Sequence, residues 1–109
     1  ADTLAALKEA KRLGARTLAI VNVVGSAIAK AADQTIYTWA GPEIAVATTK
    51  AFSTQLAVVY LLAAYMARQL GTMEEETYKA WVKGLEELPA AVEKVLSEEN
   101  VQKFLKSMI

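Results

Sequence analysis

The sequence predicts an α/β fold, in which two parallel strands of an incomplete sheet lie among helices and further helices follow at the C-terminus. Residues 17–21 and 35–38 are short apolar runs with β-branched side chains, a composition typical of strands buried on both faces. Helical segments before, between and after these runs give the alternation found in parallel sheets. A sheet normally needs more than two strands, so we expect this one to be incomplete within the chain.

Local signals bound the elements of the first 40 residues. Apolar residues over 4–13 follow helical spacing, and Gly14 is expected to end their helix. Asn22 ends the first strand, and Ser26 is a good N-cap for a short helix over residues 27–32. The Gly-Ser turn before that helix is also a possible anion site, but we prefer the capping interpretation.

The rest of the chain is predicted to be helical. A long helix should begin near Glu43 and stop at Gly71, where we divide the chain into residues 1–71 and residues 72–109. Thr72 then resembles the first residue of a capping box, with Glu three positions later. We expect Pro89 to break the next helix and a serine at position 97 to cap the last one.

An unbroken apolar run of 12 residues, 56–67, lies in the long helix. A bilayer span needs roughly 20 mostly apolar residues, so this run predicts a helix buried between layers of a soluble protein rather than a membrane helix. The first residues show no basic and then apolar signal peptide, and we expect a cytoplasmic protein.

Composition excludes several functions. Twelve basic and 12 acidic residues cancel, and no basic face with aromatic residues is present, which argues against a nucleic-acid partner. The chain contains no His and no Cys, so it lacks the commonest general base, thiol nucleophiles and the usual zinc ligands. A catalytic role for this chain alone therefore has little support from composition, and we predict no metal site and no cofactor in it.

The most informative segment is residues 41–52, GPEIAVATTKAF, which brings two hydroxyls and an ammonium to the start of the long apolar helix. The first N–H groups of a helix are unpaired, so polar residues there can serve as caps or can bind anions or sugar hydroxyls. We expect Lys50 to hold a carboxylate or a carbonyl near the turn rather than to form a Schiff base. Glu43 is favourable beside the helix macrodipole whatever else it does.

Three ordered segments carry a family resemblance: residues 1–7, ADTLAAL; residues 18–26, LAIVNVVGS; and residues 40–52, AGPEIAVATTKAF. Together they resemble the sugar isomerase (SIS) domain of the glutamine:fructose-6-phosphate aminotransferases, which make glucosamine 6-phosphate. The resemblance implies a flavodoxin-like parallel sheet, with residues 1–71 as the C-terminal part of a first SIS subdomain. Residues 72–109 would be a helical connection towards a second SIS subdomain.

The resemblance also implies site residues. Val46, through its backbone, and Thr48, through its hydroxyl, match positions that approach the sugar; the alternative for Thr48 and Thr49 is helix capping or a bond to a carbonyl. The family's phosphate loop, Ser-Gln-Ser-Gly-Glu-Thr, and its catalytic His, Glu and Lys have no counterpart in this sequence. The implied partners are a sugar phosphate in the intact protein and a second copy, through the SIS helices, while the chain alone is expected to be inactive.

Two other classes remain open from the sequence. The first is a non-enzymatic SIS module that binds a sugar phosphate in a regulator. The second is a helical assembly piece whose strands are only a scaffold. A second SIS copy with a lysine near its C-terminus would favour the enzyme, and oligomerisation through an exposed strand edge would favour the assembly piece.

Overall fold

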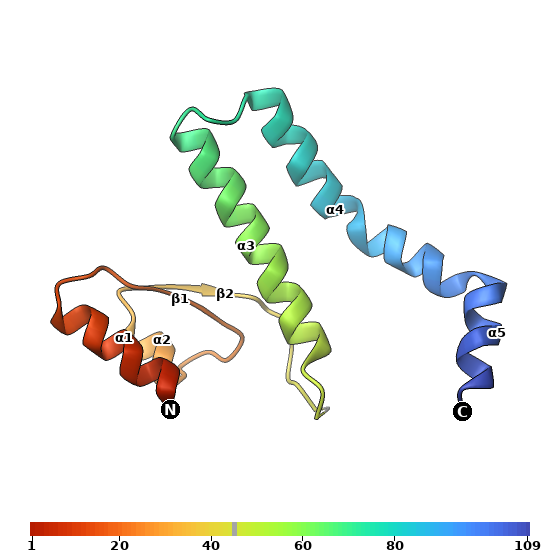
Figure 1. Cartoon of the computed structure of the whole chain (residues 1–109), viewed down its shortest axis with the longest axis horizontal. Helices are drawn as coiled ribbons and strands as arrows, with labels where there is room; N and C mark the ends of the chain where they lie inside the picture. Colours follow the sequence, from red (N-terminus) through yellow and green to blue (C-terminus); the bar gives the residue numbers. More distant parts are fainter. Residues whose placement is uncertain (45) are drawn as a thin grey trace. The chain divides into compact units, whose positions relative to one another are not determined.

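The computed structural model describes residues 1–44 and 46–109 (Figure 1). In order, the elements of this described part are α1 (Asp2–Arg12), β1 (Leu18–Val21), α2 (Ala27–Ala31), β2 (Gln34–Tyr37), α3 (Thr49–Gln69), α4 (Glu75–Ser97) and α5 (Glu99–Ser107). The chain divides into two compact units, Ala1–Tyr60 and Leu61–Ile109. The predicted boundary at residue 71 stays a prediction.

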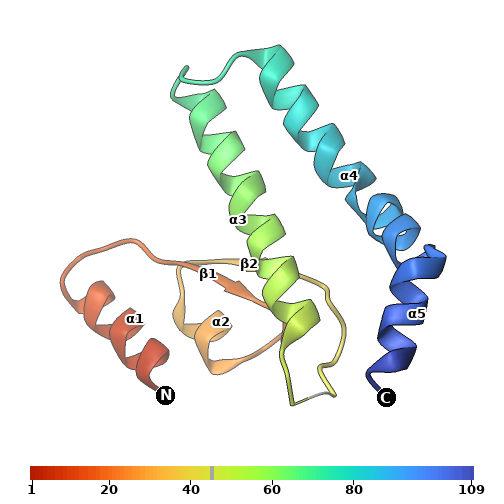
Figure 2. The same ribbon diagram turned by 45° about the vertical axis from the view of Figure 1, so that its right-hand side comes forward.

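The first unit contains the sheet, which consists of β1 and β2 in parallel. Leu18 pairs with Gln34, and Val21 pairs with Tyr37. The connection between the strands runs through α2, which contacts both β1 and α1. Figure 1 and Figure 2 both show α1 and α2 on the same side of the strand pair. The prediction of an α/β fold with two parallel strands is confirmed.

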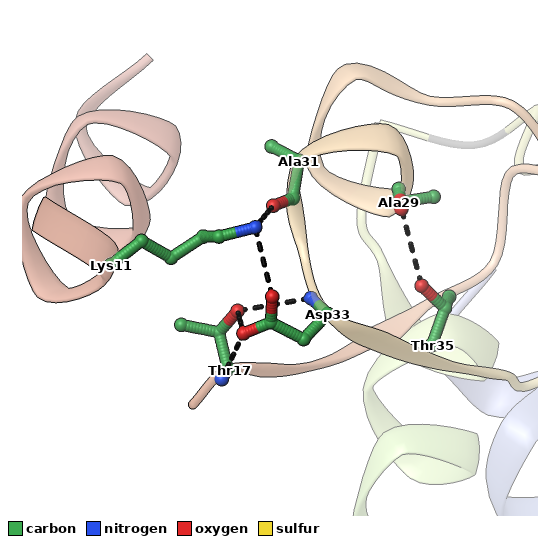
Figure 3. A network of polar contacts seen from close by, with 6 residues as sticks. All are labelled: Lys11, Thr17, Ala29, Ala31, Asp33 and Thr35. Atoms are coloured by element: carbon green, nitrogen blue, oxygen red, sulfur yellow. Dashed lines mark hydrogen bonds and ion pairs between the residues drawn. The ribbon is translucent and has the colours of Figure 1, made fainter. Parts of the chain in front are cut away.

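A polar cluster fixes the amino ends of the two strands (Figure 3). The carboxylate of Asp33 accepts hydrogen bonds from the backbone N–H and the hydroxyl of Thr17, at 2.8 and 2.9 Å. The ammonium of Lys11 lies 3.0 Å from the other carboxylate oxygen and donates to the carbonyl of Ala31 at 2.8 Å. The Lys11 contact, and then those of Thr17, lower the pKa of Asp33 to about 2. One carboxylate therefore joins α1 to the start of both strands.

Little of either unit is buried. Among the described residues only Ala19 in β1 and Ala64 in α3 are buried, at 5 % and 1 % exposure. The expectation that α3 is buried between layers is therefore wrong for this chain. Two strands of four residues offer too small an apolar face to cover a helix of 21 residues.

The start of α3 also differs from the prediction. Helix was expected from near Glu43, but α3 begins at Thr49, and residues 46–48 are not helical. The carbonyl of Thr48 accepts the first helical bond, from Phe52 at 3.0 Å, which places a hydroxyl residue beside the helix start, where such residues are favoured. Ala45 lies outside the described residues.

The helix α3 ends just before Gly71, as predicted, and Gly71 has a φ of 70°. The N–H of Gly71 donates to the carbonyl of Arg68, and the N–H of Thr72 donates to the carbonyl of Ala67, the pattern of a glycine-terminated helix. The hydroxyl of Thr72 donates to the same Ala67 carbonyl at 3.1 Å. The capping-box prediction is therefore wrong, because Thr72 serves the helix before it and Glu74 takes the N-cap position of α4.

Two further expectations for the C-terminal helices are wrong. Pro89 lies inside α4, which runs on for eight residues beyond it to Ser97. Proline removes one backbone hydrogen bond but keeps a helical φ, so the turns on either side can continue the helix. The hydroxyl of Ser97 donates backwards to the carbonyl of Lys94 at 2.8 Å, and Glu98 is the N-cap residue of α5.

By length and composition, α3 is long and apolar enough to cross a membrane, with a mean hydropathy of 1.2 over its most apolar window. The apolar run of 12 residues lies inside this helix, which is longer than the run but shorter than the helix expected from near Glu43 to Gly71. Core helices of soluble proteins pass the same criterion, so this finding alone is weak support for a membrane segment.

The Asp33 cluster predicts a specific pH dependence. The pKa of Asp33 in the folded chain, about 2, is below its ordinary value of 3.8, so ionisation favours folding above that ordinary value and the contribution is lost as pH falls towards 2. Asp33→Asn should lower the urea midpoint at about pH 7, and the difference from the unsubstituted chain should shrink at about pH 2.5.

Asp2→Asn makes the same chemical change in the first turn of α1, and it is the matched control. Urea titrations followed by circular dichroism would measure both variants. A difference for Asp33→Asn that stays constant with pH would contradict the role given to the carboxylate.

Candidate functional site

A depression of about 500 Å³ follows the open edge of β1. Backbone bonds from Gln34 to the Thr17 carbonyl and from Thr38 to the Val21 carbonyl show which residues of β1 face β2. Because successive residues of a strand direct their backbone groups to opposite sides, those of Leu18 and Ile20 face the depression. The full lining is Thr3, Leu7, Leu18, Ala19, Ile20, Val21, Asn22, Val23, Ser26, Ile28 and Gln55.

Asn22 stands at the carboxyl end of β1, the edge at which open parallel sheets bind ligands. Its Oδ1 accepts from the Ala40 backbone N–H at 2.8 Å and from the Thr38 hydroxyl at 3.1 Å. Its Nδ2 donates to the Gly41 carbonyl at 2.6 Å. Since a backbone N–H can only donate and a carbonyl can only accept, these partners also fix the orientation of the amide. One side chain thus holds the loop that follows β2.

The loop itself has an unusual backbone. Trp39 has a φ of 53°, and Gly41 has a φ of 74°, both in the left-handed region. A residue with a side chain pays roughly 1–2 kcal/mol to occupy that region, whereas glycine does so freely. The Trp39 ring lies 5.7 Å from the Tyr37 ring, and Thr38 and Ala40, its two neighbours in the chain, both bond to Asn22. These contacts offset the cost of the Trp39 conformation.

Lys50 holds the other side of the loop. Its ammonium, carried by the first turn of α3, donates to the carbonyl of Pro42 at 2.6 Å. The expectation that Lys50 holds a carboxylate or a carbonyl near the turn agrees with this contact. Both ends of residues 42–48 are therefore attached, one through Pro42 and the other through the helix start.

The structure places Val46 and Thr48 in this segment, just before α3. Both are exposed, Val46 completely so, and neither lines the depression beside β1. Thr49, the other hydroxyl considered for capping, directs its Oγ1 to the carbonyl of Ala47 at 3.5 Å. Val46 and Thr48 are thus exposed residues next to a loop that is held in place.

Ser26 behaves as a cap. Its hydroxyl oxygen accepts from the backbone N–H of Ala29 at 3.3 Å, as predicted. Among the residues that the structure describes, no group of three or more acidic, His or Cys side chains could hold a metal ion.

Sequence reasoning missed the role of Asn22, which it took only as the end of a strand. An amide residue directly after a buried strand, at the ligand-binding edge of a parallel sheet, is the signal that could have identified it. Its partners are 16–19 residues away in the sequence, so no local pattern revealed them.

Comparisons with known proteins agree with this arrangement. The model of the SIS domain family matches residues 1–65. The glutamine–fructose-6-phosphate aminotransferase (isomerizing) of Clostridium tetani is 50 % identical over 107 residues, 98 % of this chain and 18 % of that protein. The proteins of the same name from Clostridium acetobutylicum and Thermococcus kodakarensis are 53 % and 48 % identical over 105 residues each, 95 % and 96 % of this chain.

The chain spans 17 % to 18 % of the length of these three relatives. No solved structure matches it. The family model covers more than half of the chain, including α1, both strands, the loop held by Asn22 and most of α3. The chain therefore belongs to the SIS domain family.

Proposed function

We propose that this chain is a part of the isomerase region of a glutamine:fructose-6-phosphate aminotransferase. The observation that carries the proposal is 50 % identity to a protein of that name across 98 % of the chain. In the intact protein, the amide nitrogen of glutamine would be transferred to fructose 6-phosphate, which yields glucosamine 6-phosphate. This part forms one wall of the sugar-phosphate site and supplies no catalytic residue.

The geometry near α3 supports this role. The loop after β2 leaves the carboxyl edge of the sheet, where parallel sheets bind ligands, and leads to Val46 and Thr48. Both residues are exposed, so a backbone group of Val46 and the hydroxyl of Thr48 are available to sugar hydroxyls. Neutral polar contacts of this kind suit a sugar, whereas the phosphate would need cationic or N–H donors from elsewhere.

The same proposal accounts for the exposed apolar surface of the helices. Phe52, Val59 and Tyr65 of α3 are each about half exposed or more, at 61 %, 48 % and 52 %. Apolar surface of this extent is typical of a helix that packs against further protein. We propose that the rest of a cytoplasmic SIS protein, and its second copy in a dimer, cover α3, which makes a membrane role for this helix unnecessary.

The non-enzymatic SIS regulator is the competing function. Such a module would bind a sugar phosphate without turning it over. Assay of the full-length protein with glutamine and fructose 6-phosphate separates the two functions, because only the aminotransferase forms glucosamine 6-phosphate.

Thr48→Val in the full-length protein should raise KM for fructose 6-phosphate about fivefold, which corresponds to the loss of a neutral hydrogen bond of about 1 kcal/mol. Valine keeps the branched shape, so the melting temperature should change little. Steady-state kinetics and thermal unfolding measure the two effects.

Thr49→Val is the matched control, since it removes a neighbouring hydroxyl that donates to the Ala47 carbonyl at 3.5 Å. It should leave KM for the sugar phosphate unchanged. Equal effects of the two substitutions would remove Thr48 from the sugar site.

The 109-residue chain alone should not bind fructose 6-phosphate tightly. Its sequence contains no Ser-Gln-Ser-Gly-Glu-Thr phosphate loop, and a sugar held only by neutral contacts loses the charge-assisted bonds that dominate phosphate binding. Isothermal titration calorimetry should show no complex in the micromolar range. A micromolar complex would contradict the assignment of the phosphate to another segment.

A further inference from the structure

We propose that Asn22 is a positioning residue for the sugar-facing segment: it holds the loop after β2 and thereby sets the place of Val46 and Thr48. This inference rests on the proposed function for its substrate, but the loop contacts themselves come from the structure. The hydrogen bonds of Asn22 that the structure describes reach Thr38, Ala40 and Gly41, so its effect on a sugar at Val46 and Thr48 would be transmitted through the loop.

The side-chain amide of Asn22 forms hydrogen bonds with three groups of the loop after β2. Asn22 holds three groups on the two sides of Trp39: the hydroxyl of Thr38 before it, and the N–H of Ala40 and the carbonyl of Gly41 after it. The loop needs both a donor and an acceptor from the same side chain. Among residues of this size only asparagine supplies both, because aspartate offers two acceptors and leucine offers neither.

The loop that Asn22 holds leads directly into residues 42–48, which carry Val46 and Thr48. Gly41, held by Asn22, is followed directly by Pro42, whose carbonyl accepts from the Lys50 ammonium at 2.6 Å. Lys50 belongs to the first turn of α3, immediately after Thr48 and Thr49. Residues 42–48 therefore span between two fixed points. Loss of the Asn22 bonds frees Gly41, the residue before this span, and leaves the Lys50 bond to Pro42 as the one described hydrogen bond that holds the start of the span.

Thr17 allows the positioning of the loop to be distinguished from simple stabilisation of the strand pair. The same strand pair is held at its other end by Thr17, whose N–H and hydroxyl bond to Asp33. Thr17 and Asn22 stand at opposite ends of β1, but only Asn22 bonds to the loop after β2. A residue with a purely structural role at either end would affect stability and leave sugar affinity alone.

The decisive experiment compares Asn22→Asp and Thr17→Val in the full-length protein. Asn22→Asp retains an acceptor for Ala40 but places a carboxylate oxygen against the Gly41 carbonyl, where the two acceptors repel. We expect KM for fructose 6-phosphate to rise about tenfold while kcat stays within about twofold. Thr17→Val should lower the melting temperature and leave KM unchanged.

A second readout needs no activity. Trp39 is the loop's own tryptophan, and Trp81→Phe makes it the only one in the 109-residue chain. In that background Asn22→Leu should lower the fluorescence anisotropy of Trp39, whereas Thr17→Val should not. Circular dichroism shows whether each variant keeps its helices.

Three outcomes would overturn the inference: unchanged KM in Asn22→Asp, an equal rise of KM in Thr17→Val, or Trp39 anisotropy that does not respond to Asn22→Leu in a chain that keeps its helices. Failure of the proposed function looks different. The unsubstituted full-length protein would then form no glucosamine 6-phosphate, while the anisotropy of Trp39 would still report whether Asn22 holds the loop.

Discussion

The parallel pairing of β1 with β2 is the constraint on which the rest of the first unit depends. The pair is short, and a polar side chain fixes it at each end: Asp33 at the amino ends of the strands and Asn22 at the carboxyl end. A slip of one residue would reverse the faces of β2 and break both sets of bonds. The register thus determines where α1 lies at one end and where the loop towards α3 begins at the other.

This use of polar contacts follows from the lack of a core. With two buried residues in the described part of the chain, the sheet gains little from apolar burial, and directional bonds carry the specificity that packing usually provides. The second unit shows the same feature, since the Arg68 guanidinium bonds to Glu75 at 2.8 Å and lies 4.6 Å from the centre of the Tyr78 ring. Apolar side chains of its helices, among them Leu88 and Val92 of α4, are about half exposed.

The sequence predicted the elements whose signals are local and left out those set by distant partners. Gly71 ends α3 and Ser26 caps α2 as predicted, because a positive φ or a cap depends only on residues that are neighbours in the sequence. The start of α3 was placed too early by helical propensity, which carries no information on the contacts of Asn22 with Gly41, 19 residues away, that hold the loop before it. Thr72 was ambiguous for a related reason: its hydroxyl could serve the helix on either side. For the proposed sugar site, the family resemblance alone suggested Val46 and Thr48, which neither propensity nor spacing could have singled out.

The short sequence separation of the contacts around β1 and β2 has a consequence for the order of folding. The described polar contacts of Lys11, Thr17 and Asn22 join residues 16 to 22 positions apart, and each has its partner at or before Gly41. Closing loops of about 20 residues costs less entropy than bringing together more distant parts of a longer chain. During synthesis, the strand pair and its loop can therefore form before α3 has left the ribosome, and the apolar helix then emerges beside a structure that already exists.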